Sequence, residues 1–235
     1  MKMLSSLALG LLAAIAGARV YQAFWRRPIL DWGARPDEVA RRLPGDEFLE
    51  AADVVATRAI TIEAPPSAIW PWLIQMGPGR GGVYTYDWIE NLFGLDMHSA
   101  DEIVPEWQSM EVGYTWRNPQ GQGMRAEIVD PERAIVMRAE DGRWVWAFVI
   151  VPEGDGTRFI SRNRFVLSGG TLARWASIYL MEPGSLVMER RMLLGIKSRA
   201  ERLAARQADP ARSAVPTGRP DATMADELEL VGTTA

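Results

Sequence analysis

The chain has 235 residues, and its 48% hydrophobic content excludes wholesale disorder and allows one domain with a sizeable core. A net charge of −4 argues against a nucleic-acid-binding protein, which commonly presents a basic face. With no cysteine and a single histidine, His98, a disulfide and a thiolate metal site are excluded, and a zinc site or a Ser-His-Asp triad built on histidine is not expected. We expect no metal and no cofactor.

The first 27 residues are predicted to form a transmembrane helix. Residues 3–25 are mostly apolar, and as a helix they would extend roughly 35 Å, enough to cross a bilayer core of about 30 Å. Tyr21, Phe24 and Trp25 suit the membrane interface. The arginines that follow favour a single-pass protein of the cell membrane with a cytoplasmic main domain. The alternative is a signal peptide with its cleavage site at Ala16-Gly17-Ala18, which would export the protein.

Three further regions follow. Residues 28–50 are predicted to be a polar connector with one short helix at 37–42, residues 51–206 the domain, and residues 207–235 a disordered tail rich in Pro, Ala, Thr and Gly. Alternating apolar residues and turn signals predict strands at 54–62, 114–118, 124–130, 134–139, 144–151 and 157–167.

Helices are expected between the first and second strands and after the last strand. Pro65-Pro66 opens a helix with a buried face, which Pro71 should kink. A second helix is predicted at 84–93, with Trp88, Ile89 and Leu92 as its apolar stripe. At the end of the domain, Glu182-Pro183-Gly184 should separate a helix at 171–181 from a long helix at 185–205.

The segment from Ala59 to Leu73, a strand that runs into Ala64-Pro65-Pro66 and an amphipathic helix, resembles the opening of the SRPBCC superfamily, also called START-like or polyketide cyclase/dehydrase-like. The segment Met188–Lys197 is similar to the end of a bacterial subgroup with an N-terminal membrane segment. The resemblance covers about residues 51–206. It implies an α+β helix-grip fold, in which a curved antiparallel sheet wraps around a long C-terminal helix and encloses a ligand cavity.

The strand at 144–151 is the main candidate for the wall of that cavity. Period-two alternation places Trp144, Trp146, Phe148 and Ile150 on one face, where cavity lining and plain core packing would coincide. The residues that we expect to contact a ligand are Trp72, Tyr84, Trp88, Trp144, Trp146, Phe148, Met188 and Glu189.

Glu189 lies on or beside the apolar stripe of the last helix, so its carboxylate needs a partner if it is buried. Arg162 and Arg164 are candidates, but they lie on the opposite face of their strand from Asn163; if the aromatic face points inward, this pairing fails and the arginines face solvent. A charge on the helix surface is the alternative.

Two loop segments each permit a functional and a structural interpretation. Gly79-Arg80-Gly81-Gly82 before the helix at 84–93 suits either an anion site or a structural turn. His98, between Asp96 and Asp101, suits either acid–base chemistry or loop capping.

The residues favour a membrane-anchored module that binds or transports a hydrophobic small molecule or lipid, with no nucleic-acid partner. The first alternative is an enzyme of the cyclase or hydratase kind that acts on a polyketide-like or other apolar substrate, with Asp87, Glu189 and His98 as candidate acids or bases. The second is a membrane-tethered partner protein with a collapsed pocket.

Overall fold

The structure is a computed structural model that describes residues 2–209, with side chains from residue 10 onward except residue 11. Its contacts divide the chain into Met1–Ala204 and a second unit, Ala205–Ala235, of which only the last helical residues and Asp209 are described. Most of the predicted tail, residues 210–235, therefore lies outside the described residues. The first unit is the subject below.

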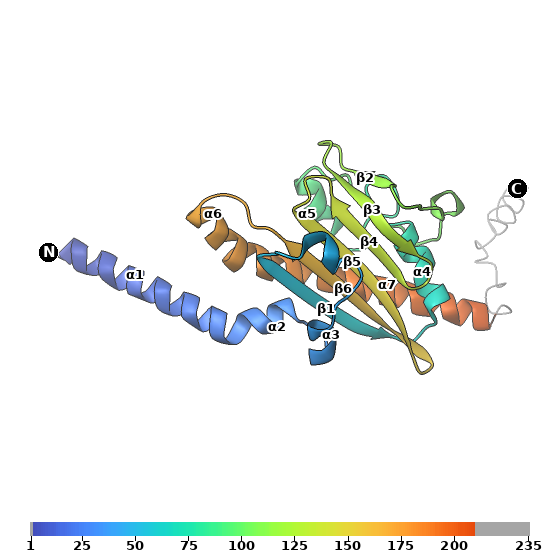
Figure 1. The fold of residues 1–235 in the computed structure, drawn as a ribbon, viewed down its shortest axis with the longest axis horizontal. Coiled ribbons are helices and arrows are strands. Elements are labelled where there is room, and N and C mark those ends of the chain that lie inside the picture. Colours follow the sequence, from blue (N-terminus) through green and yellow to red (C-terminus); the bar gives the residue numbers. More distant parts are fainter. Residues whose placement is uncertain (1, 210–235) are drawn as a thin grey trace, which may run out of the picture. The chain divides into compact units, whose positions relative to one another are not determined.

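Six strands form one antiparallel sheet in the order β1-β6-β5-β4-β3-β2 (Figure 1). The predicted bounds of β1 and β4 are confirmed, and those of the other four strands are correct to within two residues. The strands are β1 (Val54–Ile62), β2 (Thr115–Arg117), β3 (Gly123–Asp130), β4 (Ala134–Ala139), β5 (Trp144–Glu153) and β6 (Gly156–Phe165). Strand order follows chain order except for β1, which pairs with β6 and becomes the opposite edge.

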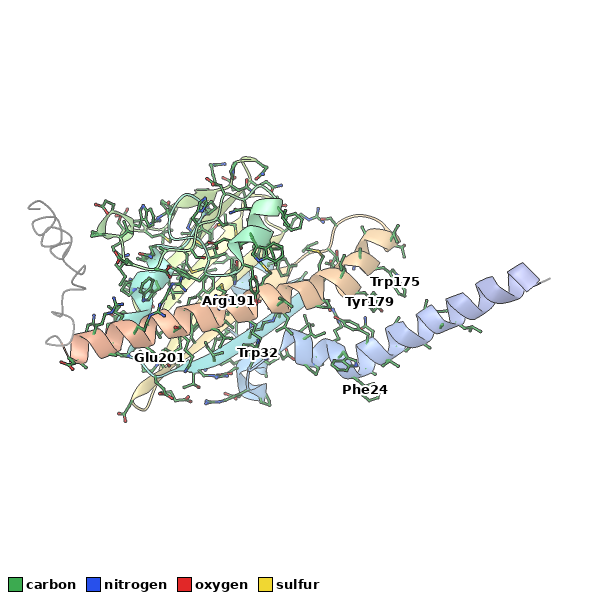
Figure 2. All side chains as sticks on the ribbon, turned by 180° about the vertical axis from the view of Figure 1, so that it is seen from behind. Phe24, Trp32, Trp175, Tyr179, Arg191 and Glu201 are labelled. Atoms are coloured by element: carbon green, nitrogen blue, oxygen red, sulfur yellow. The ribbon has the colours of Figure 1, made fainter. Side chains whose placement is uncertain are left out.

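The helix α7 (Glu182–Ala208) runs across one face of the sheet, here called the inner face, as the two opposite views show (Figures 1 and 2). Met192, Leu193 and Ile196 of α7 pack in the same core as Phe148 and Phe159 of the sheet. The helix α4 (Pro66–Ile74), which continues through Pro71, contributes to this core as well. A six-stranded antiparallel sheet with a long C-terminal helix is consistent with the predicted α+β helix-grip architecture.

The helix α5 (Asp87–Leu92) is shorter than predicted, and its two faces are reversed. Asp87 accepts hydrogen bonds from the backbone N–H and the hydroxyl of Ser99, and Asn91 bonds to the backbone of Met97, so the polar face is turned to the following loop. The expected apolar stripe is wrong, since Trp88 and Leu92 are exposed. These four hydrogen bonds to one loop hold α5 with Trp88 and Leu92 toward the solvent.

The predicted break at Glu182-Pro183-Gly184 is also wrong. The helix α6 (Thr171–Ala176) continues through the π-helical segment η4 (Ser177–Met181) directly into α7. The N–H of Glu182 bonds to the carbonyl of Ser177, five residues back. Proline interrupts a regular helix because its ring collides with the carbonyl four residues earlier. The wider turn of η4 comes directly before Pro183, so the chain stays helical.

The N-terminal region is helical as predicted but has the same irregularity. The helix α1 (Lys2–Val20) passes into the π-helical segment η1 (Tyr21–Trp25) and then into α2 (Arg26–Leu30), which contains Pro28. No helix within the described part of the chain combines the length and the apolar run that crossing a bilayer requires.

The connector, predicted as a polar segment with one short helix, packs against the sheet. At the edge of the sheet the N–H of Ala59 in β1 bonds to the carbonyl of Trp32, and beyond this point the chain packs on the outer face. Leu43 packs there with Val149 and Ile160. This segment contains α3 (Pro36–Ala40) and a 3₁₀ turn, η2 (Asp46–Leu49); a second 3₁₀ turn, η3 (Pro105–Trp107), follows α5. The connector thus covers an edge strand, which would otherwise expose unpaired backbone groups.

Three arginines of β6 fasten the connector to the outer face of the sheet. Arg158 pairs with Glu38, at 2.6 Å between Nε and Oε1. Arg162 and Arg164 both pair with Asp46, at 2.7 and 3.1 Å. Burial alone would raise the pKa of Glu38, but Arg158 and the backbone N–H of Arg35 bring it below its ordinary value. The Glu38 carboxylate is therefore held in its charged form between the connector and the sheet.

The loop before α5 is built as a turn. Gly77 and Gly82 pair as an isolated antiparallel bridge, and Arg80 donates to the backbone carbonyls of Trp107 and Ser109. Since this guanidinium is engaged with carbonyl groups and α5 has only six residues, the arrangement favours the structural interpretation of the glycine-rich loop over an anion site.

Gly82 gives a test of this turn. It has φ +63°, and a Cβ there would lie 2.9 Å from the backbone of His98, whereas Gly79 has φ +67° with open space around it. Gly79→Ala should cost only the left-handed penalty of about 1–2 kcal/mol. Gly82→Ala should cost about 1–3 kcal/mol more, because the loop at His98 must move. Urea unfolding of both variants measures the difference, and equal stabilities would contradict it.

Candidate ligand-binding site

A buried polar cluster interrupts the apolar layer between α7 and the sheet. It consists of Arg58 of β1, Ser161 and Asn163 of β6, and Glu189 of α7, and is called the Glu189 cluster below. Arg58 and Glu189 form an ion pair with side-chain exposures of 1% and 6%. The other carboxylate oxygen, Oε1, accepts from the Ser161 hydroxyl at 2.5 Å and from the Asn163 amide at 3.0 Å. The carboxylate is therefore met by three donors.

Strand periodicity brings these groups together. Arg58 lies directly opposite Ser161 in the antiparallel register, and Asn163 follows two residues later on the same face. Glu189 lies one turn before Leu193, which is in the inner core, so the first half of α7 places its carboxylate over this part of the sheet. The inner layer is apolar beneath Met192, Leu193 and Ile196, and becomes polar at Glu189.

Two tryptophans of β5 are hydrogen-bonded to the same cluster. Trp146 Nε1 donates to Ser161 Oγ at 2.9 Å, and Trp144 Nε1 donates to Asn163 Oδ1 at 2.8 Å. The two indole rings stack at 5.5 Å, and Trp144 also stacks on Phe165 at 5.3 Å. Both indoles are half-buried. Their polar edges are thus satisfied from beneath, while part of each apolar ring remains accessible.

Burial raises the pKa of the Glu189 carboxyl above its ordinary value, and Arg58, Ser161 and Asn163 act against this rise. A buried carboxylate without partners would take up a proton, because desolvation disfavours its charge. The adjacent guanidinium and the two neutral donors offset part of this cost.

Further contacts fix the first half of α7 from both sides. Arg58 also donates to the carbonyl of Ile29 and to the Ser185 hydroxyl at 3.0 Å. Arg190 lies over the ring of Trp32 at 5.3 Å, and Arg191 lies over Tyr86 at 5.7 Å. Figure 2 shows Arg191 and Trp32 beside the middle of this helix. The Glu189 cluster is consequently held in a rigid frame.

The structure brings together some of the predicted ligand-contacting residues and separates others. Trp144, Trp146 and Glu189 meet at the Glu189 cluster, and Met188, half-buried, precedes Glu189 on α7. Trp72, Tyr84 and Phe148 belong to the fully packed core, where the Tyr84 hydroxyl donates to the Trp72 carbonyl at 2.8 Å. Trp88 is 66% exposed on α5.

The three candidate acids and bases do not form one constellation. Asp87 bonds to Ser99, and His98 is exposed with its ring 3.1 Å from Asp96 Oδ1. These contacts are those expected of loop capping. Within the described part of the chain, no group of three or more His, Cys, Asp or Glu side chains could hold a metal ion. Glu189 alone is both buried and adjacent to an accessible aromatic surface.

A cavity of about 560 Å³ lies elsewhere, beside the start of β1, between α2 and the connector. Its lining includes Arg26, Arg41, Asp46 and Arg162 but none of the eight residues predicted to contact a ligand. The buried residues between the sheet and α7 form an apolar core, and the Glu189 cluster lies at one end of it. The half-buried rings of Trp144 and Trp146 lie beside this cluster on the inner face.

Sequence reasoning missed Arg58, Ser161 and Asn163 as members of the site. The pairing of Glu189 with Arg162 and Arg164 is wrong, because both arginines are on the outer face. They are nevertheless covered by the connector, with side-chain exposures of 3% and 14%. The sequence did contain a pattern that indicates Arg58. In period two, Arg58 shares one strand face with Ile60 and Ile62, which face the core.

No family model and no curated protein matches this chain. Among solved structures, a Polyketide_cyc-like protein from Corynebacterium glutamicum is 15% identical, with 70% of this chain and 97% of that chain covered and a TM-score of 0.32. An AHSA1-like protein from Aeromonas hydrophila is 14% identical, with 63% and 93% covered and a TM-score of 0.35. A protein from Thermobifida fusca is 13% identical, with 63% and 94% covered and a TM-score of 0.41. At these values, nothing about what those proteins bind or do is carried over to this chain.

Proposed function

We propose that the protein binds a hydrophobic small molecule or lipid against the inner face of its sheet, beside the first half of α7. The observation that carries this proposal is the pair of stacked, half-buried indoles, whose N–H groups are bonded to Asn163 and Ser161. Rings oriented in this way offer a flat apolar surface with no unsatisfied polar edge. Burial of apolar ligand area there would supply roughly 25 cal/mol per Å² before the costs of binding.

The Glu189 cluster has an orienting role in this proposal. Ser161 and Asn163 each use one side of their side chain for Glu189 and the other for a tryptophan. A shift of the carboxylate would therefore change the position of both indoles. A catalytic role for Glu189 is the weaker reading, because both of its oxygens are already engaged by Arg58, Ser161 and Asn163.

We also propose that the chain is associated with the cell membrane through residues 3–25, with the main domain on the cytoplasmic side. The large apolar side chains described in this segment, Leu12, Ile15, Phe24 and Trp25, are exposed, and exposed apolar side chains gathered on one helix mark interaction sites. The arginines that follow the segment support this orientation.

The ligand proposal is tested by native mass spectrometry of the full chain released from its own membranes. We expect an apolar molecule of discrete mass on the wild-type protein. Trp146→Ala should reduce its occupancy, with binding about tenfold weaker or more, because one aromatic wall is worth about 1.5–3 kcal/mol. Trp146→Phe, which keeps a ring but loses the bond to Ser161, should have an intermediate effect.

Trp88→Ala is the matched control, because it removes the same side chain from an exposed position on α5. It should leave occupancy unchanged. A wild-type protein that carries no such molecule, or equal losses in Trp88→Ala and Trp146→Ala, would rule out binding at this wall.

A further inference from the structure

The two π-helical segments of the chain, η1 and η4, meet although they are more than 150 residues apart in the sequence. The ring of Tyr179 lies 5.1 Å from that of Tyr21 and 4.9 Å from that of Trp175. The Tyr179 hydroxyl accepts from the Gln22 amide at 3.3 Å. Figure 2 shows Trp175 and Tyr179 on the helical run that precedes the core part of α7, and Phe24 on the N-terminal helix beside it.

An ion pair between half-buried Arg26 and buried Glu182 fixes this junction. Glu182, the first residue of α7, is 5% exposed and accepts from Arg26 at 2.8 Å and from the Tyr21 hydroxyl at 3.2 Å. Each π segment has a proline shortly after it, Pro28 or Pro183, so both irregular turns are part of how the chain stays helical here. The two segments therefore form one structural unit.

The outside of this unit is apolar and uncovered. We call it the two-helix apolar surface; its exposed side chains are Phe24, Trp25, Leu172, Trp175, Leu180 and Met181. All six residues of α6 are exposed, so nothing within the described part of the chain packs over that helix. Large exposed apolar side chains gathered on neighbouring helices mark contact with a partner or a membrane.

The local charge indicates which of these it is. Residues 10–31 and 171–191 contain six arginines and three acidic residues, whereas the whole chain has a net charge of −4. Arg26, Arg27 and Arg174 are paired with Glu182, Asp31 and Asp53. Arg19, Arg190 and Arg191 form no ion pair with an acidic side chain of the described residues, so the excess of positive charge remains. Cationic side chains beside tryptophan, tyrosine and leucine are the composition of segments that lie in the interface of an anionic bilayer. The surface also continues directly from α1, the segment proposed to associate with the membrane.

We propose that α6 and η4 form a second membrane contact, which docks the domain on an anionic lipid surface together with η1. This inference rests on the proposed membrane association of residues 3–25. It adds that the domain is not merely tethered but lies against the bilayer through the two-helix apolar surface. The first half of α7, with the Glu189 cluster beneath it, follows directly from this contact.

The chain contains no cysteine, so single labelling sites can be introduced without further changes. Leu180→Cys on η4 and Leu92→Cys on α5 are matched, because both leucines are exposed, at 69% and 75%. Each full-length variant is labelled with the environment-sensitive fluorophore NBD and mixed with vesicles of phosphatidylcholine and phosphatidylglycerol. We expect a several-fold rise in emission and a blue shift for Leu180→Cys, quenched by brominated lipid, and no change for Leu92→Cys.

The outcomes separate this inference from the proposed membrane association. If the labelled chains do not float with the vesicles, membrane association itself is wrong. If they float but the label at position 180 stays in water, or responds equally at position 92, docking through α6 and η4 is wrong. A shift at position 180 that depends on protein concentration and needs no vesicles would show that a second copy of the chain covers the surface, which also overturns the inference.

Discussion

Replacing Arg58 by methionine is expected to lower the free energy of unfolding by about 3–5 kcal/mol, because it leaves the Glu189 carboxylate buried without its countercharge. Ser161 and Asn163 would still donate to Glu189, but neutral donors compensate a buried charge only in part. The carbonyl of Ile29 and the Ser185 hydroxyl would lose a partner at the same time. Urea unfolding followed by circular dichroism measures the effect.

The double variant Arg58→Met/Glu189→Leu separates the cost of an unpaired charge from the loss of side-chain packing. Removing both charges should recover most of the lost stability, since a buried ion pair replaced by apolar groups is often close to neutral. Arg42→Met is the control: it breaks the exposed pair with Glu50 and should cost less than about 1 kcal/mol. A double variant as unstable as the sum of its single variants would contradict a mutual role of Arg58 and Glu189.

Period-two alternation, together with turn residues, was sufficient to predict the strands. In β5 and β6 each strand face has a distinct chemistry, with Trp146 and Phe148 against Val145 and Ala147, so the bounds and the shared faces followed from the residues alone. Turn residues such as Asp141-Gly142 marked where one strand ends and the next begins. The antiparallel meander and the long last helix were therefore predictable.

The partner of Glu189 was not predictable from periodicity. Alternation tells which residues share a face, but Arg58 reaches Glu189 only because β1 is drawn back beside β6, over a separation of more than 100 residues. That pairing depends on strand order, which local pattern does not contain. Trp144 and Trp146 share one face of one strand, so alternation predicts that they lie together. Whether Trp88 of α5 joins them depends on how the helix packs, which alternation does not tell.

The orientation of α5 shows a second limit. Of the three residues in its predicted apolar stripe, Trp88 and Leu92 face outward and Ile89 is half-buried. In a helix of six residues the apolar area is small, and four bonds from Asp87 and Asn91 to the loop at 97–99 outweigh it. Hydrophobic periodicity decides orientation for long helices such as α7 and not for a helix of this length.

The connector shows why a polar segment can be structural. Its residues were interpreted as a polar connector because Pro, Gly and charged residues are frequent in it. The matching signal was in β6, where Arg158, Arg162 and Arg164 share one face of the strand with the apolar Ile160. Three arginines on the buried face of a strand require acceptors, and the connector supplies them as carboxylates and backbone carbonyls.

Arg162→Met should consequently release the connector and lower the free energy of unfolding by about 3 kcal/mol. The Arg162 guanidinium is 3% exposed and donates to Asp46, to the Thr57 hydroxyl and to the backbone carbonyls of Glu38, Val39 and Arg41. Asp46 would keep Arg164 at 3.1 Å and the Leu43 N–H, so the main loss is of donors to the connector backbone. Burial lowers the pKa of Arg162, yet this guanidinium remains charged at neutral pH.

Limited proteolysis distinguishes a loosened connector from general unfolding. In Arg162→Met, cleavage should appear first within residues 33–50, under conditions in which the wild-type chain stays intact and both retain the same far-ultraviolet circular dichroism. Arg35→Met is the matched control, because Arg35 belongs to the connector itself but forms only an exposed pair with Glu153. Early cleavage in Arg35→Met, or cleavage of Arg162→Met that begins within the strands, would show that the three arginines do not hold the connector on the sheet.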